Sequence, residues 1–422
     1  MVKRSMAGAA MLVALILSGC NNGGGSNNTA SGILKALIAI PNVKAGTNFS
    51  FDISDVDSAT GRVYFTDRNN KSVDVIDIRT NTLLKQITGG FAGCDTGPTC
   101  AGATNDQSGP DGLNRIPGTT FIYVGDVNSV KIIDTQTDTV VKTIAIGGAS
   151  GLRADEGCYD PDHKIFMISS PGETPPFATF IDTVTQKIIA TLLFTDPGSG
   201  PAGPPSGGLE ACVYDHGTAS FLVNNDTSTA NPHGEVDVIP ASAILVGTPA
   251  APVTLTLPAI AAGNGFKAFA LGNCDPTGID LGPGTDLVVA CREGTAGVPL
   301  TTLILNRVNG SLLATVPIGG GDQVVYDSSQ NRYYLAASRW TASGLSSGLA
   351  CTAASPCTPV LGIIDAATRT LIGNPVTGNN AHSVTVDPTS HQVYLPYSSA
   401  TAPAGCSSCT NVPDGGVLVF QE

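Results

Sequence analysis

The feature that most constrains the fold of this 422-residue chain is an internal repeat. The segment GRVYFTDRNNKSVDVIDIRTNTLLKQI at 61–87 matches TFIYVGDVNSVKIIDTQTDTVVKTIAI at 120–146 in its order of apolar and polar residues. Each segment reads as an alternating strand, a polar turn, a second strand ending in Asp, a Thr-rich turn and a third strand. Such a period of tens of residues predicts an array of one β unit, because a single unit cannot bury its apolar face alone.

Further copies of the unit begin near residues 164, 220, 286, 332 and 392, and those at 220 and 286 are the most divergent. The last copy stops one strand short, while ILKALIAIP at 33–41 has strand character and precedes the first full copy. If this segment pairs with the last unit, seven four-stranded units close into a ring without exposed edges. We therefore predict an all-β protein, a seven-bladed β-propeller whose last blade is closed by the N-terminal strand.

Composition agrees with a turn-rich β fold. The chain has 50 Gly and 28 Pro, and only 13% of its residues are charged, about half the usual share of a soluble domain. We expect a single propeller domain over residues 33–422. Its expected blades cover approximately 48–88, 106–147, 150–194, 206–258, 263–317, 319–375 and 379–422.

The third and fourth strands of the units carry a family resemblance. VDVIDIRTNTLLKQI, KIIDTQTDTVVKTIAIGG, FIDTVTQKIIATL and GIIDAATRTLIG resemble the YVTN-type repeats of YncE-like propellers. The resemblance extends over nearly all of residues 33–422 and implies the same propeller fold. We assign the repeated aspartates a structural role, as caps of the turn between the two strands. They are Asp77, Asp134, Asp182 and Asp365.

Residues 1–19 resemble a bacterial lipoprotein signal peptide. Lys3 and Arg4 precede an apolar run, and Leu17-Ser18-Gly19 stands directly before Cys20, as in a lipobox. The alternative, a transmembrane helix, needs about 20 apolar residues, roughly twice the run present. We expect Cys20 to be lipidated, residues 20–32 to form a flexible tether, and the protein to be anchored in the cell envelope. Asn21 favours the outer membrane, with the periplasmic or exterior side left open.

Ten cysteines follow Cys20, an even number that suits disulfide bonds in an exported chain. Three pairs are close in sequence, and two more are suggested by strand positions in the propeller. No His follows Cys409, which argues against covalent haem, and we expect no haem, nucleotide or flavin. The expected disulfides are Cys94–Cys100, Cys158–Cys212, Cys274–Cys291, Cys351–Cys357 and Cys406–Cys409.

One position near the start of the first strand is ionisable in every unit. The first strands of a propeller line its central channel, so a sevenfold position forms a ring near one mouth of that channel. Some of these side chains could accept hydrogen bonds from backbone amides of the adjacent blade. The ring consists of Asp52, Asp111, Asp155, Glu210, Asp275, Asp322 and His382.

Six carboxylates converging on a narrow channel repel one another unless a cation or bound protons intervene. We expect calcium or another divalent cation, since several carboxylates and water satisfy it, while His382 also permits a transition metal. LEACVYD at 209–215 and PDGL at 110–113 are similar to metal-ligand segments of the regucalcin and gluconolactonase family. His382 alone matches the copper-cluster ligands of nitrous oxide reductase, and that chemistry is not carried over.

These observations leave three functions open. We expect a non-catalytic, lipid-anchored propeller, a monomer that binds a protein or small molecule on one face. The alternative is a metal-dependent, lactonase-like hydrolase with Glu210, Asp275 and His382 as candidate catalytic residues. A third possibility is an accessory protein of a cell-surface or electron-transfer assembly. The formal net charge of −13 argues against nucleic acid as a partner.

Overall fold

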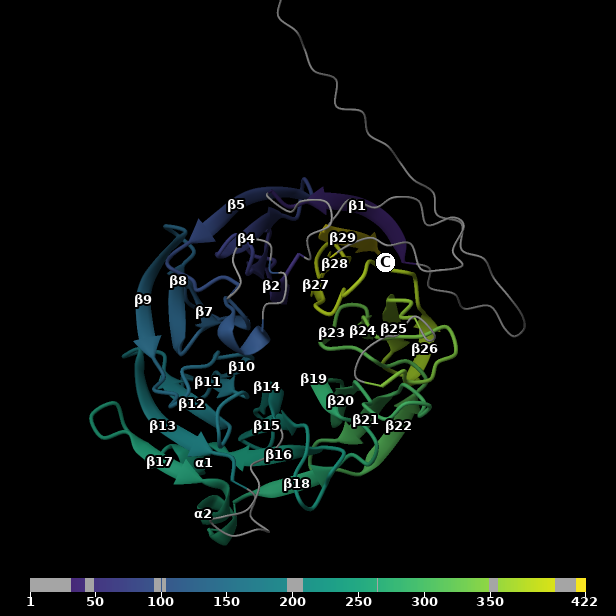
Figure 1. Ribbon diagram of the computed structural model, residues 1–422. Coiled ribbons are helices and arrows are strands. Elements are labelled where there is room, and N and C mark those ends of the chain that lie inside the picture. The colour runs from purple at the N-terminus through teal and green to yellow at the C-terminus, as the bar shows by residue number, and fades with distance from the viewer. Residues whose placement is uncertain are drawn as a thin grey trace, which may run out of the picture.

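The computed structural model describes residues 32–41, 49–94, 100, 104–195, 208–263, 265–348, 356–398 and 415–422. These residues form seven sheets in a ring around a central axis, so the predicted seven-bladed β-propeller is confirmed (Figure 1). The expected signal peptide, Cys20 and most of the tether lie outside the described residues. Among the described residues, no helix has the length and apolar character needed to cross a membrane.

The first two strands of each blade lie nearest the axis and pair antiparallel. The innermost strands are β2 (Phe51–Asp57), β6 (Leu113–Arg115), β10 (Gly157–Asp160), β14 (Leu209–Asp215), β19 (Pro276–Leu281), β23 (Val324–Asp327) and β27 (Thr385–Asp387). The second strands are β3 (Arg62–Asp67), β7 (Phe121–Asp126), β11 (Ile165–Ser170), β15 (Ser220–Asn225), β20 (Asp286–Cys291), β24 (Arg332–Ala337) and β28 (Gln392–Tyr397).

The third strands complete the buried part of each blade, and the fourth strands form the circumference (Figure 1). The third strands are β4 (Ser72–Asp77), β8 (Ser129–Asp134), β12 (Phe177–Asp182), β16 (Glu235–Pro240), β21 (Thr302–Asn306), β25 (Val360–Asp365) and β29 (Gly416–Gln421). The fourth strands are β5 (Thr82–Thr88), β9 (Thr139–Ala145), β13 (Lys187–Leu193), β18 (Lys267–Ala270), β22 (Leu312–Val316), β26 (Thr370–Gly373) and β1 (Ile33–Ala39).

The seventh blade is built from both ends of the chain. Strand β1 pairs antiparallel with β29, from Ile33 opposite Gln421 to Ala39 opposite Gly416. The prediction that the N-terminal strand closes the last blade is therefore confirmed. Strand β1 thus becomes the outer strand of the seventh blade and covers β29, which would otherwise be the exposed edge.

The blade bounds differ from expectation at the third and fourth blades. Strand β17 (Val253–Thr256), expected in the fourth blade, adds to β13 as a parallel fifth strand of the third. Strand β18, expected in the fifth blade, takes its place beside β16. The helices α1 (Ala241–Ile244) and α2 (Leu257–Ala262) flank β17 and bury Ile244, Leu257 and Ile260. Burial of these apolar side chains stabilises β17 beside β13. The strand therefore pairs with the third blade, although the spacing of the repeat predicts the fourth.

Burial follows the position of a strand within its blade. All six residues of β4 are buried, because neighbouring blades cover both of its faces, whereas β9 on the circumference alternates between exposed and covered residues. The aspartates at the ends of third strands cap the following turns, as expected. Asp77 Oδ1 accepts the Arg79 N–H at 2.7 Å, and Asp365 Oδ1 accepts the Thr368 N–H at 2.7 Å.

Three disulfides occur within the described residues, and they are three of the five pairs expected from the sequence. Cys94 is bonded to Cys100, and Cys274 to Cys291. The third joins Cys158 on β10 to Cys212 on β14, with Cα atoms 5.6 Å apart, and so ties the inner strands of two adjacent blades together. The expected pairs Cys351–Cys357 and Cys406–Cys409 include residues outside the described ranges.

Candidate functional site

A cavity of about 180 Å³, here called the mouth cavity, lies at the N-terminal ends of the inner strands. Its lining is almost entirely polar and contains both acids and arginines. The acidic side chains that line it are Asp52, Asp155, Glu156, Glu210 and Asp322. The basic ones are Arg68, Arg153, Arg292, Arg339 and His382.

The structure brings together most of the predicted ring. Five of its seven members line the mouth cavity, and a sixth, Asp111, lies fully buried against Arg68. Asp275 does not line the cavity, and its carboxylate accepts the backbone N–H of Gly294. The candidate catalytic residues Glu210, Asp275 and His382 therefore do not form one group.

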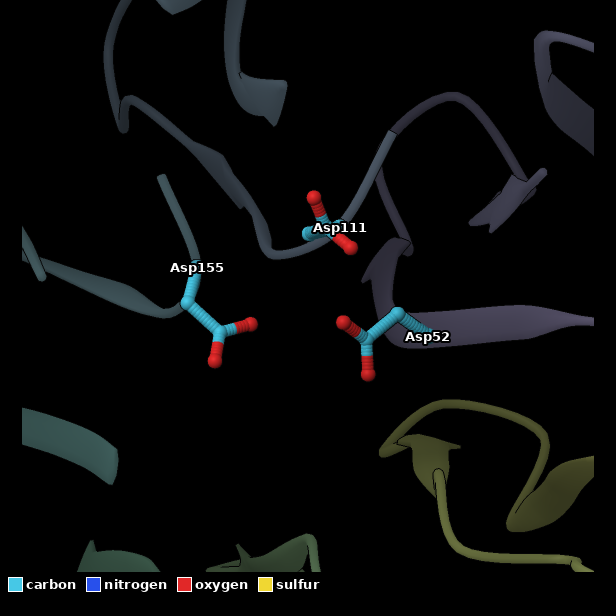
Figure 2. Close-up of side chains that lie close together, drawn as sticks. All are labelled: Asp52, Asp111 and Asp155. Atoms are coloured by element: carbon cyan, nitrogen blue, oxygen red, sulfur yellow. The ribbon is translucent and has the colours of Figure 1, made fainter. Parts of the chain in front are cut away.

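Asp52, Asp111 and Asp155 form the first acidic group, with carboxylate oxygens within 4.8 Å of one another (Figure 2). We call them the arginine-bound cluster. Gly112 permits this close approach of the second and third blades. Its N–H donates to the Asp155 carbonyl at 3.1 Å, and a Cβ at this position would lie 2.1 Å from that oxygen. The backbone contact therefore places Asp111 beside Asp155.

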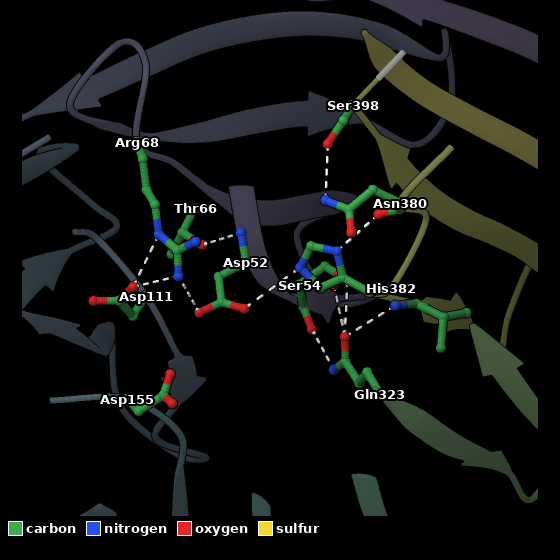
Figure 3. Close-up of polar contacts among 12 residues, drawn as sticks. Asp52, Ser54, Thr66, Arg68, Asp111, Asp155, Gln323, Asn380, His382 and Ser398 are labelled. Atoms are coloured by element: carbon green, nitrogen blue, oxygen red, sulfur yellow. Dashed lines mark hydrogen bonds and ion pairs between the residues drawn. The ribbon is translucent and has the colours of Figure 1, made fainter. Parts of the chain in front are cut away.

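Two arginines pair with the arginine-bound cluster, and Figure 3 shows one of them, Arg68. Arg68 donates to Asp52 Oδ2 at 2.7 Å and from Nε to Asp111 Oδ1 at 2.9 Å. Arg153 binds Asp155 through two nitrogens, at 2.8 and 3.0 Å. Such two-point contacts between a guanidinium and a carboxylate are among the strongest hydrogen bonds in proteins.

The electrostatic environment differs within this cluster. Burial opposes ionisation of Asp52, but Arg68, His382 and Arg153 outweigh it and lower its pKa to about 2. Burial raises the pKa of Asp155 to about 7, with Arg153 acting against the rise. Asp52 is thus the carboxylate that these cations hold ionised over the whole neutral range.

His382 belongs to the arginine-bound side of the cavity. Its Nε2 lies 3.6 Å from Asp52 Oδ1, and its Nδ1 lies 2.7 Å from the Asn380 carbonyl oxygen (Figure 3). Its ring stacks on Phe51. Burial lowers the pKa of His382, yet Asp52 and Asp322 outweigh burial and raise it above the usual value. The imidazole is therefore held in place as a partner of Asp52.

Glu156, Glu210 and Asp322 form the second acidic group, and their ligand oxygens also lie within 4.8 Å of one another. We call them the open cluster. In the described part of the chain, its one arginine contact is Arg292 Nη1, 3.5 Å from Glu210, and Arg292 also pairs with Asp226 at 3.2 Å. Among the described residues, neither the Glu156 nor the Asp322 carboxylate has a hydrogen-bond or ion-pair partner.

Glu156 is the most unusual member of the open cluster, because only 9% of its surface is exposed. Burial raises the pKa of Glu156 well above its ordinary value, and Asp322 and Asp155 raise it further. Burial also raises the pKa of Glu210, and Asp226 and Asp322 add to this effect. Burying an ionised carboxylate without a partner costs free energy, so a bound proton or a bound cation would stabilise this group.

Some ring residues were expected to accept hydrogen bonds from backbone amides of the adjacent blade. In the structure, residues further along the inner strands accept such bonds. Asp55 accepts the Arg115 N–H at 3.0 Å, and Asp280 accepts the Tyr326 N–H at 2.7 Å, each from the next blade. Both line a second cavity of about 260 Å³. Glu156 borders this cavity as well as the mouth cavity.

The four arginines and Glu156 were not among the predicted site residues. Three of the arginines follow second strands: Arg68 after β3, Arg292 after β20 and Arg339 after β24. Alignment of the second strands would have revealed this position. Glu156 had no comparable signal, since alternation along a strand predicts that it faces away from its neighbour Asp155. The pair precedes the regular part of β10, so alternation does not hold there.

Comparison with known proteins supports the architecture. A search of solved structures finds hydrazine synthase from Kuenenia stuttgartiensis, with a TM-score of 0.60 and 13% identity over 90% of this chain and 97% of that chain. At this identity the likeness shows the fold alone. A scan against protein-family models and a search of curated proteins find no match.

Proposed function

We propose that this protein is a lipid-anchored binding propeller of the bacterial cell envelope, related to the YncE-like propellers. Its mouth cavity would hold a divalent cation between Glu156, Glu210 and Asp322 and use it to bind a partner molecule. The repeat segments and the lipobox at Cys20 support the family and the anchor. The open cluster supports the cation.

The observation that carries the proposal is the Glu156 carboxylate. It is buried, has no hydrogen-bond partner among the described residues, and lies with two further carboxylates at ligand spacing. Oxygen ligands of a hard divalent cation stand about 2.0–2.6 Å from the ion, so oxygens within 4.8 Å of one another suit a shared ion. The arginine-bound cluster has the same spacing, but its carboxylates already pair with arginine side chains, so it is not part of the proposed site.

The decisive experiment uses the chain without residues 1–20, stripped of metal with a chelator. Calorimetric titration with calcium, magnesium and manganese chlorides at neutral pH should show one site for at least one cation. Glu156→Gln and Asp322→Asn should each weaken binding at least about tenfold, since each removes one charged ligand. Asp111→Asn serves as the matched control in the other cluster and should retain binding. Absence of binding for all three cations would reject the cation site.

A lactonase-like hydrolase, the alternative from sequence, would use the same cation. We place it second because His382, its candidate base, is engaged with Asp52 and Asn380 on the arginine-bound side. Hydrolysis of simple lactones by the metal-loaded protein, lost in Glu156→Gln, would reverse this order.

A further inference from the structure

We propose that Arg339 and Ser338 form an oxyanion subsite in the mouth cavity, which binds the carboxylate or phosphate group of a small ligand. This inference rests on the proposed function in one respect, because the anion would lie beside the cation of the open cluster. The subsite itself is built from residues that the cation does not need.

Arg339 differs from the other arginines of the mouth cavity. Arg68, Arg153 and Arg292 each pair with at least one carboxylate within 3.2 Å. Arg339 lines the same cavity, yet its guanidinium has no ion pair or side-chain hydrogen bond to any residue in the described part of the chain. A guanidinium offers five N–H donors in a planar fork that matches a carboxylate or a phosphate. The described residues supply no such acceptor to Arg339.

Ser338 adds a second donor at the same place. Its side chain is buried, with 7% of its surface exposed, and it lines the mouth cavity. No described residue forms a hydrogen bond with its hydroxyl. A hydroxyl without a partner in the protein is free to donate a hydrogen bond to an oxyanion bound in the cavity.

The backbone that presents this pair is fixed. The Arg339 N–H donates to the Gly320 carbonyl at 2.8 Å. Gly320 has a φ of +74°, and a Cβ there would lie 2.9 Å from the Arg339 carbonyl carbon. Only glycine fits this close contact in the left-handed conformation. The backbone that carries the two donors therefore has a defined position before any ligand arrives.

The placement of charges favours a ligand over a purely structural role. Two acids, Glu210 and Asp322, line the same cavity, but neither lies within ion-pair distance of Arg339. An arginine that held the cavity wall together through its charge would pair with a carboxylate, as the other three arginines do. With a cation in the open cluster, the cavity would present a metal and a guanidinium together. Small acids that coordinate metals through a carboxylate or phosphate match this arrangement.

The sequence contains a natural reporter for the test. Trp340, the single tryptophan of the chain, directly follows Arg339. We would titrate the protein without residues 1–20 with acetate and with methylphosphonate, exchanging each for chloride at constant ionic strength. Tryptophan fluorescence and calorimetry would be followed with and without the cation. The tighter of the two anions identifies the carboxylate or the phosphate as the preferred group.

Saturable binding of one anion to the wild type is expected, and Arg339→Gln should weaken it about tenfold or more through loss of a charged hydrogen-bonding group. Arg339→Lys should restore part of the affinity, since it keeps the charge but not the fork. Arg79→Gln, which removes an exposed arginine elsewhere, should leave binding unchanged. Thermal unfolding of each variant checks that it is folded.

Equal anion affinity in the wild type and Arg339→Gln, or no binding of either anion, would overturn the inference. The cation titration separates this failure from failure of the proposed function. Arg339→Gln should still bind the cation, because Arg339 is not one of its ligands. Loss of the anion with retention of the cation in that variant supports both proposals.

Discussion

The arginine-bound cluster and the open cluster contain the same kind of side chain at the same spacing, yet they are in different electrostatic states. Each has three acidic residues with oxygens within 4.8 Å of one another. The first has Arg68 and Arg153 at hydrogen-bond distance, whereas the second, within the described ranges, has only Arg292 at 3.5 Å, shared with Asp226. A ring of carboxylates therefore does not by itself define a metal site. The neighbouring arginine side chains determine which carboxylates remain able to bind a metal ion.

Asp155 and Glu156 give this comparison its sharpest form, because adjacent residues belong to different clusters. The Asp155 carboxylate binds Arg153 through both oxygens. The Glu156 carboxylate has no partner among the described residues. Replacing either carboxylate by its amide is therefore the same chemical change at adjacent positions. In one case the carboxylate is paired with an arginine, and in the other it is not.

The largest effect is expected from Arg68→Gln. This change leaves Asp52 and Asp111 buried without their main cation, and breaking a buried ion pair typically costs about 3 to 5 kcal/mol of unfolding free energy. Urea denaturation of the wild type and the variant measures the loss. Arg79→Gln, at an exposed pair, is the control and should unfold like the wild type. A loss no larger than that of the control would mean that Arg68 does not stabilise the arginine-bound cluster.

The second prediction compares Asp155→Asn with Glu156→Gln in the presence of a chelator. Asp155→Asn should lower the unfolding free energy by about 1 to 3 kcal/mol, because it replaces the charged, two-oxygen acceptor of the buried Arg153 by a neutral amide with one acceptor oxygen. Glu156→Gln should leave it unchanged or raise it by about 1 kcal/mol, since it removes a buried group that is costly to ionise. Equal destabilisation by both variants would remove the distinction between the clusters.

The third prediction is that Asp52 and the open cluster give opposite dependences of stability on pH, whereas Asp155, whose pKa burial raises to about 7, adds to the effect of the open cluster. The pKa of Asp52 is lowered from 3.8 to about 2, so its contribution, about 2 kcal/mol, is present above pH 4 and lost as the pH falls toward 2. The pKa values of Glu156 and Glu210 are raised. Their neutral forms are favoured in the folded state, so cation-free protein should lose stability as the pH rises above about 4.5.

Chemical denaturation across this pH range tests both slopes. Asp52→Asn should flatten the acid limb, and Glu156→Gln should flatten the limb at higher pH. A saturating cation should also flatten the latter, because it replaces the protons. Identical pH profiles for wild type and both variants would show that neither cluster governs the dependence.

The smallest expected effect is a change in the pKa of His382. Asp52 raises this pKa from a distance of 3.6 Å, so Asp52→Asn should lower it by about one unit or less. Titration of the imidazole signals by NMR measures the shift. Glu156→Gln is the control from the open cluster and should leave the His382 titration nearly unchanged. A larger shift in the control would place His382 with the other cluster.

The fold could be predicted because its signal is repeated. Alternating strands, Asp and Thr in the turns and a strand-like segment at 33–41 recur often enough that the number of blades and their closure follow from the sequence. The prediction was weakest at the third and fourth blades. There, packing of α1 and α2 redirects β17, and such tertiary contacts have no periodic signature.

The site could be predicted only in its acidic half. The inner-strand position gave Asp52, Asp155, Glu210, Asp322 and His382, which all line the mouth cavity. Which of these acids has its charge neutralised by an arginine depends on which second strand lies across the channel mouth. The alternation of apolar and polar residues along a strand does not predict that arrangement. Bulges add to the difficulty, since register shifts early in β2, β14 and β19 interrupt the alternation from which side-chain direction is inferred.

The pairing of β1 with β29 has a consequence for the order of folding. The two strands join residues 33–39 to residues 416–421, the most distant pairing in the described chain. Contacts of such long range form late, because the chain must lose the entropy of closing a long loop before it gains the contacts. Single blades can form from local hairpins before that event. The mouth cavity cannot, since it needs Asp52 of the first blade and His382 of the seventh in contact. Binding activity should therefore appear only with the final kinetic phase of refolding.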